Sequence, residues 1–396
     1  MRTKWGPGMT ATPEVARFAD RVRRRLVETG GAPTAARVAA TVQAEPGGSV
    51  LGQATFARLV GRITDELGGA GPLAPLLAEE EVSDVLVNGA EVWVDRGGGL
   101  ERAGVDVGRP DDVRRLAQRL AATAGRRLDD GCPYADVPLP DGTRLHAVLP
   151  PVAVAGPYLS LRAFRRRVFT LAELVDAGSV SPMGARLLST IVAGRIAFLI
   201  TGGTGTGKTT LLSALLSLVP QNERMVLVED AAELRPAHPH VVTLQARTSN
   251  VEGAGGVTLR DLVRQALRMR PDRLVVGECR GSEVVDLLGA LNTGHEGGAA
   301  TLHANTPADV PARLEALGLL DGVPRAALHA QVAAALQVVV HLRRIGGQRV
   351  VDEICMLLPD GPDRLVRAVP AWHRERGYGP GAEALAGLCG AAWQAS

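Results

Sequence analysis

Apolar positions recur with two different spacings along the chain, and the change of spacing divides it into regions. Near the N-terminus the apolar side chains recur every three or four positions, as in the stretch Val15–Leu26. This spacing places them on one face of a helix. It recurs in residues 34–43 and 56–67. The pattern therefore predicts a helical N-terminal extension over residues 1–70.

Short runs with the pattern of strands follow this extension. Val82–Gly89 and Glu91–Arg96 mix apolar and polar positions between turn residues, as strands with one buried face do. A helical stretch, Asp111–Ala124, lies between these runs and further short ones. We expect a smaller α+β domain over residues 71–167 and a linker over residues 168–175.

The rest of the chain alternates apolar runs of strand length with helical stretches. The runs Ile196–Ile200, Met225–Glu229 and Arg273–Glu278 are mostly apolar, as strands buried on both faces are. Strands that alternate with helices indicate a largely parallel sheet, with ligands at the carboxyl ends of its strands. The predicted fold class is α/β, with this domain over residues 176–358. Residues 359–396 are predicted to form a Gly- and Ala-rich tail that is weakly ordered toward its end.

A glycine-rich loop follows the run Ile196–Ile200 and leads into a helical stretch. It matches G-x-x-x-x-G-K-[ST] at every fixed position, in the strand, loop and helix context that this motif requires. Glycines let backbone N–H groups turn toward an anion, and the start of the helix adds its positive dipole end. A loop that was glycine-rich only for flexibility would not end in Lys-Thr. The predicted nucleotide-binding residues are Gly202, Gly203, Thr204, Gly205, Thr206, Gly207, Lys208, Thr209 and Thr210.

The loop and one strand-end acid predict a site for ATP and Mg²⁺. Lys208 would reach the β- and γ-phosphates, and the Thr209 hydroxyl would bind the Mg²⁺ that bridges them. Glu278 ends an apolar strand, and we expect it across from Thr209 on the neighbouring strand, with a water-mediated contact to Mg²⁺. The alternative for Glu278 is a solvated acid just beyond a strand.

Hydrolysis also needs a group that orients or deprotonates water, and positive charge for the transition state. Glu229 ends another strand and is the candidate base, ahead of Asp230 and Glu233. Arg144 and Arg162 lie at predicted strand ends in the preceding domain and would supply the positive charge. Arginines in such places are otherwise solvated or paired locally.

Two histidines, His295 and His303, flank a short predicted strand. A single histidine usually packs in a core or caps a turn. Their spacing spans a strand and includes no cysteine, so a metal site is not indicated. The functional alternative is that an imidazole senses the γ-phosphate.

Composition excludes several classes of protein. The 396 residues include 44 basic and 42 acidic side chains, so the net charge of +2 favours neither nucleic acid nor an acidic membrane as a partner of the whole surface. The four cysteines form no C-x-x-C pair, which argues against a zinc ribbon or a disulfide framework. The N-terminus lacks the apolar region of a signal peptide, and no apolar run is long enough to span a membrane. We therefore expect a cytoplasmic protein.

Together these motifs resemble those of the VirB11-like ATPases of type II/IV secretion, within them the TadA/CpaF-type ATPases of tight-adherence (Flp) pili and related conjugal-transfer-associated proteins. The resemblance extends from about Gly71 to Leu357. The C-x-x-C zinc element of type II secretion relatives is absent, which argues against that branch. The matching segments are Val82–Gly89, Asp141–Arg144, Gly202–Thr210, Glu229–Leu234, Leu267–Glu283 and Asn292–Asn305.

The resemblance implies a homohexameric ring with a RecA-like C-terminal domain that hydrolyses ATP. Such a ring is peripheral at the inner face of the cytoplasmic membrane. It works with an integral membrane platform protein in pilus assembly, secretion or conjugal-transfer-type transport, and no stable nucleic acid partner is expected. The family pattern also gives positions to residues named above: Glu278 in Walker B, Glu229 in an acidic box, His295 and His303 in a histidine box, and Arg144 and Arg162 among arginines that reach the phosphates.

Two other functions remain open. A RecA-like DNA-processing motor would carry a basic channel with aromatic side chains, whereas only 3% of the residues are aromatic. A catalytically silent ring scaffold would bind nucleotide without turning it over, but Lys208, Thr209, Glu229 and Glu278 are all present. The motifs do not identify the transported substrate, the membrane partner, or the choice among assembly, retraction and secretion.

Overall fold

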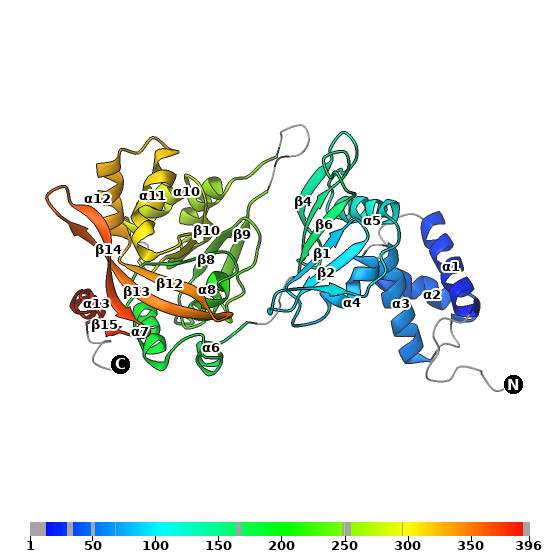
Figure 1. The fold of residues 1–396 in the computed structure, drawn as a ribbon, viewed down its shortest axis with the longest axis horizontal. Helices are drawn as coiled ribbons and strands as arrows, with labels where there is room; N and C mark the ends of the chain where they lie inside the picture. Colours follow the sequence, from blue (N-terminus) through cyan, green and yellow to red (C-terminus); the bar gives the residue numbers. More distant parts are fainter. Residues whose placement is uncertain are drawn as a thin grey trace. The chain divides into compact units, whose positions relative to one another are not determined.

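The computed structural model describes residues 13–29, 35–48, 52–67, 69–163, 168–247, 249, 255–294 and 296–390. The chain divides into two compact units, Met1–Arg165 and Arg166–Ser396 (Figure 1). The division falls just before the linker predicted at residues 168–175. Each unit is described by itself.

The first unit begins with helices that share a small core. They are α1 (Pro13–Glu28), α2 (Ala35–Ala44) and α3 (Gln53–Leu67), as the three-to-four spacing predicted. Their apolar stripes meet because each helix is too short to be stable without packing. The buried residues of this core include Val22, Leu26, Val38, Val42 and Ile63.

An antiparallel sheet forms the rest of the first unit, in the strand order β3-β2-β1-β6-β5-β4. One face buries alternate residues of the strands against helix α5, and the predicted α+β character of this region is confirmed. The elements are η2 (Gly71–Leu73), α4 (Ala74–Leu77), β1 (Asp84–Asn88), β2 (Glu91–Asp95), β3 (Leu100–Ala103), α5 (Pro110–Thr123), β4 (Tyr134–Pro138), β5 (Arg144–Val148) and β6 (Tyr158–Arg162).

The second unit is built on a mixed sheet in the order β15-β14-β13-β12-β7-β11-β10-β8-β9. The strands from β12 to β9 in this order run parallel, as the alternation of strands and helices predicted. Strands β13, β14 and β15 extend the sheet in antiparallel fashion. The strands are β7 (Phe198–Gly202), β8 (Met225–Glu229), β9 (Val241–Gln245), β10 (Arg273–Cys279), β11 (Ala299–Leu302), β12 (Val338–Ile345), β13 (Gln348–Asp360), β14 (Leu365–His373) and β15 (Gly377–Tyr378).

Helices cover both faces of this sheet, as the α/β prediction requires (Figure 1). One face carries α6 (Leu171–Asp176), α7 (Pro182–Ala193), α8 (Lys208–Leu216) and α13 (Ala382–Cys389). The other face carries α9 (Leu259–Ala266), α10 (Glu283–Leu291), α11 (Val310–Leu319) and α12 (Arg325–Ala335), with the short turns η3 (Leu267–Met269) and η4 (Pro307–Asp309).

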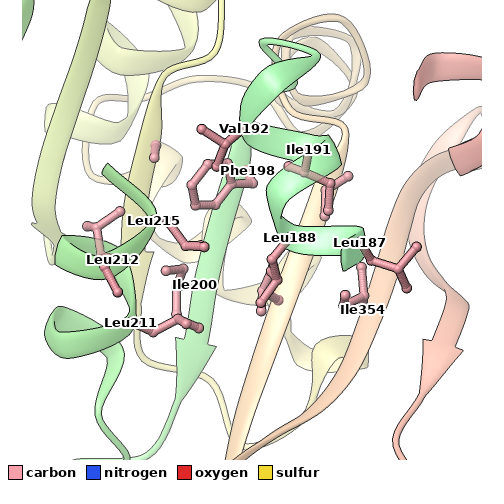
Figure 2. Packing of buried hydrophobic residues seen from close by; sticks show 14 of the residues in the cluster. Leu187, Leu188, Ile191, Val192, Phe198, Ile200, Leu211, Leu212, Leu215 and Ile354 are labelled. Atoms are coloured by element: carbon pink, nitrogen blue, oxygen red, sulfur yellow. The ribbon is translucent and has the colours of Figure 1, made fainter. Parts of the chain in front are cut away.

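Strand β7, which leads into the glycine-rich loop, lies in the middle of these layers. Figure 2 shows Ile191 of α7 and Leu211 of α8 beside Phe198 and Ile200 of β7. The alternate residue Leu199 is fully buried in the core on the opposite face. Burial of aliphatic side chains on both faces stabilises the strand by roughly 1.5–3 kcal/mol per side chain. The start of the loop is therefore fixed in place.

Two sequence predictions about the borders of this unit are wrong. Residues after 359 do not begin a weakly ordered tail, because β13 continues to Asp360, and β14, β15 and α13 follow it. Trp372 of β14 and Leu385 of α13 are buried in the core. The predicted linker also extends too far, since Leu171 and Leu174 of α6 are buried in the same core.

Candidate nucleotide-binding site

The glycine-rich loop joins the carboxyl end of β7 directly to α8. Gly202 is the last residue of β7 and Lys208 is the first residue of α8, which confirms the predicted strand, loop and helix. Gly205 and Gly207 have φ values of +70° and +94°, in the left-handed region that favours glycine. A Cβ on Gly202 would lie 2.6 Å from the Leu342 backbone oxygen. These glycines let the loop backbone turn without side chains that would crowd it. An anion can then approach the start of α8, where the N–H groups of the first turn attract negative charge.

Lys208 folds back over the start of this loop. Its Nζ donates to the backbone oxygens of Gly202 and Gly203, at 3.1 and 2.9 Å. The same Nζ lies 3.3 Å from His303 Nε2. Burial lowers the pKa of Lys208, and the charge of Glu278 opposes this shift. The ammonium is thus held at the carboxyl end of β7, where the phosphates of a bound nucleotide would lie.

Glu278 is the next-to-last residue of β10, and both of its carboxylate oxygens have partners. Oε1 lies 2.9 Å from His303 Nε2, and Oε2 accepts a hydrogen bond of 2.7 Å from Arg280 Nη2. Burial would raise the pKa of Glu278, but the hydrogen bond from Arg280 and the charges of Arg280, His303 and Lys208 together lower it. Glu278 is therefore ionised at neutral pH.

His303 connects Glu278 to Lys208 across the sheet. It directly follows β11, which lies between β7 and β10 in the strand order. Burial, with the Lys208 charge, lowers the pKa of His303 and favours the neutral ring. An N–H on Nε2 can donate to Glu278 Oε1, and Nδ1, 3.5 Å from Lys208 Nζ, is then the nitrogen that can accept from the ammonium. The prediction that Glu278 lies on the strand next to β7 is wrong, because β11 pairs with both strands. One ring nitrogen, Nε2, lies 3.3 Å from Lys208 Nζ and 2.9 Å from Glu278 Oε1, so His303 brings the two side chains close together.

Glu229 is the last residue of β8, the neighbour of β10 on the other side. Its side chain is buried, and Oε1 accepts the N–H groups of Glu233 and Leu234 at 3.0 and 2.9 Å. Oε2 is buried with no hydrogen-bond partner among the residues that the structure describes. Burial raises the pKa of Glu229 to about 7. A Cβ on Gly277 of β10 would lie 2.8 Å from Glu229 Cγ, so the carboxyl group needs a glycine beside it.

The raised pKa predicts that Glu229 makes stability depend on pH. As the pH rises from 4.5 to about 7, the unfolded chain releases this proton before the folded chain does, so the free energy of unfolding falls. Glu229→Gln keeps the Oε1 acceptor and removes the charge. We expect this variant to lack that decrease and to be more stable than the wild type above pH 7, by roughly 1–3 kcal/mol.

Denaturant unfolding at pH 5, 6, 7 and 8 measures this difference. Glu233→Gln is the matched control, because Glu233 is an exposed acid on the same turn. If the free energy of unfolding changes with pH equally in the wild type and in Glu229→Gln, the assignment of the raised pKa to Glu229 is contradicted. If Glu229 is also the base, turnover of the wild type will rise with pH over the range in which its stability falls.

The predicted arginines lie in the first unit. Arg144 begins β5 and Arg162 ends β6, directly opposite each other in the register of the two strands. Arg144 donates twice to Asp136, at 2.8 and 2.7 Å, and Arg162 donates to Asp84 at 3.2 Å. Their role toward the phosphates stays a prediction. His295 lies outside the described residues, and its role also stays a prediction.

Two contacts of the site were missed in the sequence. Arg280 was part of a matching segment but had no assigned role, although its place two residues after Glu278 was a usable signal. His341 of β12 is buried, and its Nδ1 lies 2.9 Å from the Oγ1 of Thr201, the residue before Gly202. Burial lowers the pKa of His341. Strand register brings these residues together across 140 positions, so no local pattern could have shown the pair.

The oxygen donors at this site fit a metal that arrives with a nucleotide. Among the described residues, no three His, Cys, Asp or Glu side chains gather as an all-protein metal site. Thr209, in the first turn of α8, and Glu278 provide one hydroxyl and one carboxylate. Mg²⁺ is commonly held by such a small set of protein oxygens together with substrate phosphates.

The fold and this cluster define a nucleotide hydrolase of the phosphate-loop class. The chain belongs to the family described as Type II/IV secretion system protein, whose model matches residues 66–373. Within that family it is a secretion ATPase, as the sequence motifs predicted. The assignment to the tight-adherence pilus branch stays a prediction.

Named relatives cover most of the chain. A protein of Mycobacterium tuberculosis strain H37Rv, provisionally named as a conjugal transfer protein, is 57% identical over 328 residues, which are 81% of this chain and 93% of that protein. The conjugal transfer protein TrbB of Rhizobium radiobacter is 31% identical over 303 residues, 75% of this chain and 90% of TrbB. The solved structure of the Legionella pneumophila ATPase DotB has a TM-score of 0.51 at 18% identity, over 74% of this chain and 81% of DotB. At that identity the likeness to DotB shows the fold alone.

Proposed function

We propose that this protein is a hexameric motor that hydrolyses ATP to power pilus assembly, protein secretion or conjugal-transfer-type transport. The observation that carries the proposal is the continuous chain of contacts from Lys208 through His303 to Glu278, at the carboxyl ends of three strands of one sheet. A site built only to hold a nucleotide would not need a strand-end acid connected to the phosphate-binding lysine. The names of the M. tuberculosis and Rhizobium relatives support transport as the output.

The residues of this site have separate tasks in the proposed reaction. Lys208 exchanges its contacts with the Gly202 and Gly203 oxygens for the β- and γ-phosphates of ATP. Thr209 and, through water, Glu278 would hold Mg²⁺, which would neutralise charge on these phosphates. Glu229 takes the proton of the attacking water, which its raised pKa permits near neutral pH.

In this proposal His303 reports the γ-phosphate. Its ring contacts both Lys208 and Glu278, so a phosphate that draws Lys208 away changes the surroundings of the imidazole. We further propose that Arg144 and Arg162 supply positive charge from the first unit, and that His295 acts with His303. Two arginines opposite each other on adjacent strands would suit an anion of high charge. Like charges in this arrangement repel each other, and without a bound anion the acids Asp136 and Asp84 neutralise them.

The motor would act on an integral membrane platform protein, at the inner face of the cytoplasmic membrane. In the part of the chain that the structure describes, no helix is both long and apolar enough to cross a membrane.

The test is to measure ATP turnover of the purified full chain with two kinds of addition. Inner-membrane vesicles from the source organism should raise turnover, and chemical crosslinking in those vesicles should join the protein to one integral membrane protein. Single-stranded DNA should leave turnover unchanged. A many-fold rise with DNA and none with membranes would instead support a DNA-processing motor. The Lys208→Ala variant measures background turnover from contaminating ATPases in both arms.

A further inference from the structure

The turn between β10 and α10 is fixed by a buried acid. The backbone N–H groups of Arg280 and Gly281 both donate to Glu283 Oε1, at 2.6 and 2.7 Å. Glu283 is only 6% exposed, so it holds this turn from the inside. A Cβ on Gly281 would lie 2.9 Å from Glu283 Oε2. Any larger residue at position 281 would therefore displace the carboxylate that fixes the backbone of Arg280.

From this fixed backbone, the side chain of Arg280 reaches back to Glu278. Nη2 donates to Glu278 Oε2 at 2.7 Å. The other oxygen, Oε1, is then directed to His303 and the side of the site that holds Lys208. The terminal torsion of a glutamate is broad, and the Glu278 side chain is 23% exposed. Without Arg280 the carboxylate would have a partner on one oxygen and could turn about that torsion.

We propose that Arg280 is a positioning residue for ATP hydrolysis, which acts through Glu278 by keeping Oε1 directed into the phosphate site. The proposal rests on the role of Glu278 at Mg²⁺ proposed above. Packing does not explain Arg280, because its side chain is 56% exposed. An ion pair that is this exposed contributes little to folding. Removing it should therefore change the function of Glu278 and leave the stability of the fold nearly unchanged.

Mg²⁺ should strengthen the binding of a fluorescent ATP analogue. In Arg280→Ala, the Mg²⁺ concentration that gives half of this effect should be several-fold higher than in the wild type. Turnover should fall by about 10-fold, because a small misplacement of a catalytic group is costly. The thermal unfolding midpoint and the affinity for the analogue without Mg²⁺ should stay unchanged. Arg280→Lys, which keeps the charge, should fall between wild type and Arg280→Ala. Arg367→Ala is the matched control, since the exposed side chain of Arg367 in β14 pairs with that of Asp360 in β13, and it should change nothing.

A double-mutant cycle with Glu278→Gln separates this inference from the proposed function. If Arg280 acts through Glu278, then Arg280→Ala will shift the Mg²⁺ requirement no further in the Glu278→Gln background. Additive shifts, or a loss of turnover by Arg280→Ala with an unchanged Mg²⁺ requirement, would overturn the inference alone. A Glu278→Gln variant with a normal Mg²⁺ requirement would overturn both the inference and the proposed role of Glu278.

Discussion

Glu278→Gln is expected to reduce ATP turnover at least ~100-fold while ATP binding changes little. The amide keeps the shape of the side chain and its contact with His303, but it carries no charge for the Mg²⁺ shell. The phosphate loop and Lys208, which supply most of the binding, are untouched. The loss should therefore appear in kcat, because the acid matters most when charge develops on the transferring phosphoryl group.

Equilibrium binding of a fluorescent ATP analogue and steady-state phosphate release measure the two effects on the same preparation. Glu283→Gln is the control for a general disturbance of this strand end, since Glu283 lies on the same turn and its Oε1 accepts from the backbone N–H groups of Arg280 and Gly281. Its Oε1 acceptor survives the change, so it should retain most of the turnover. Near-normal turnover in Glu278→Gln would remove Glu278 from the mechanism.

Lys208→Ala is expected to weaken ATP binding at least ~100-fold, and to abolish turnover with it. Among the described residues of the loop, Lys208 is the one with a basic side chain. Its ammonium donates to two backbone oxygens of the loop. Its removal takes a charge-assisted contact from the β- and γ-phosphates, and such contacts are roughly twice as strong as neutral ones. Lys208→Arg should fail as well, because a planar guanidinium does not fit a site shaped for a compact ammonium.

The composition of the chain allows a direct test of this role. Lys4 and Lys208 are the only lysines in the sequence, which otherwise uses arginine. A lysine-reactive acyl phosphate of ATP should therefore label Lys208, and added ATP should protect it, while any label on Lys4 should be insensitive to ATP. Labelling of both lysines that ATP does not change would show that Lys208 does not contact the phosphates.

The glycine-rich loop was predictable because its information is local. Gly202 to Thr210 specify a turn, a helix start and an ammonium within nine consecutive positions, and the apolar run before them specifies the strand. The positions of the acids Glu229 and Glu278 were also predictable, since each lies at the carboxyl end of a buried strand and the carboxyl ends of parallel strands meet at one edge. Because the strands of this sheet are buried on both faces, their apolar runs identify them even where the predicted bounds differ by a residue or two from those in the structure.

The order of the strands was not predictable in the same way. Nothing in the sequence near Ala299–Leu302 shows that β11 lies between β7 and β10. This order makes His303 the link between Lys208 and Glu278. The pair of Thr201 and His341 depends likewise on the register of β7 with β12.

The end of the sheet was missed because its residues resemble a loop. Pro359 and Pro370 interrupt the apolar pattern, and proline is usually excluded from strand interiors. Both are nevertheless in register, with Pro359 opposite Val366 and Pro370 opposite Cys355 next to an irregularity of the pairing. Burial of Ala371 and Trp372 stabilises β14 in spite of these prolines.

The most direct test of the account is whether bound ATP is hydrolysed. The full chain is mixed with Mg²⁺ and ATP labelled in the γ-phosphate, and the release of labelled phosphate is followed alongside the recovery of intact ATP. The account predicts repeated turnover that needs Mg²⁺ and is lost in Glu278→Gln, whose bound ATP is recovered intact. If the wild-type protein instead binds ATP stoichiometrically and the ATP is recovered intact, even where the proposed hexamer has formed, the account is contradicted and the protein is a nucleotide-binding scaffold.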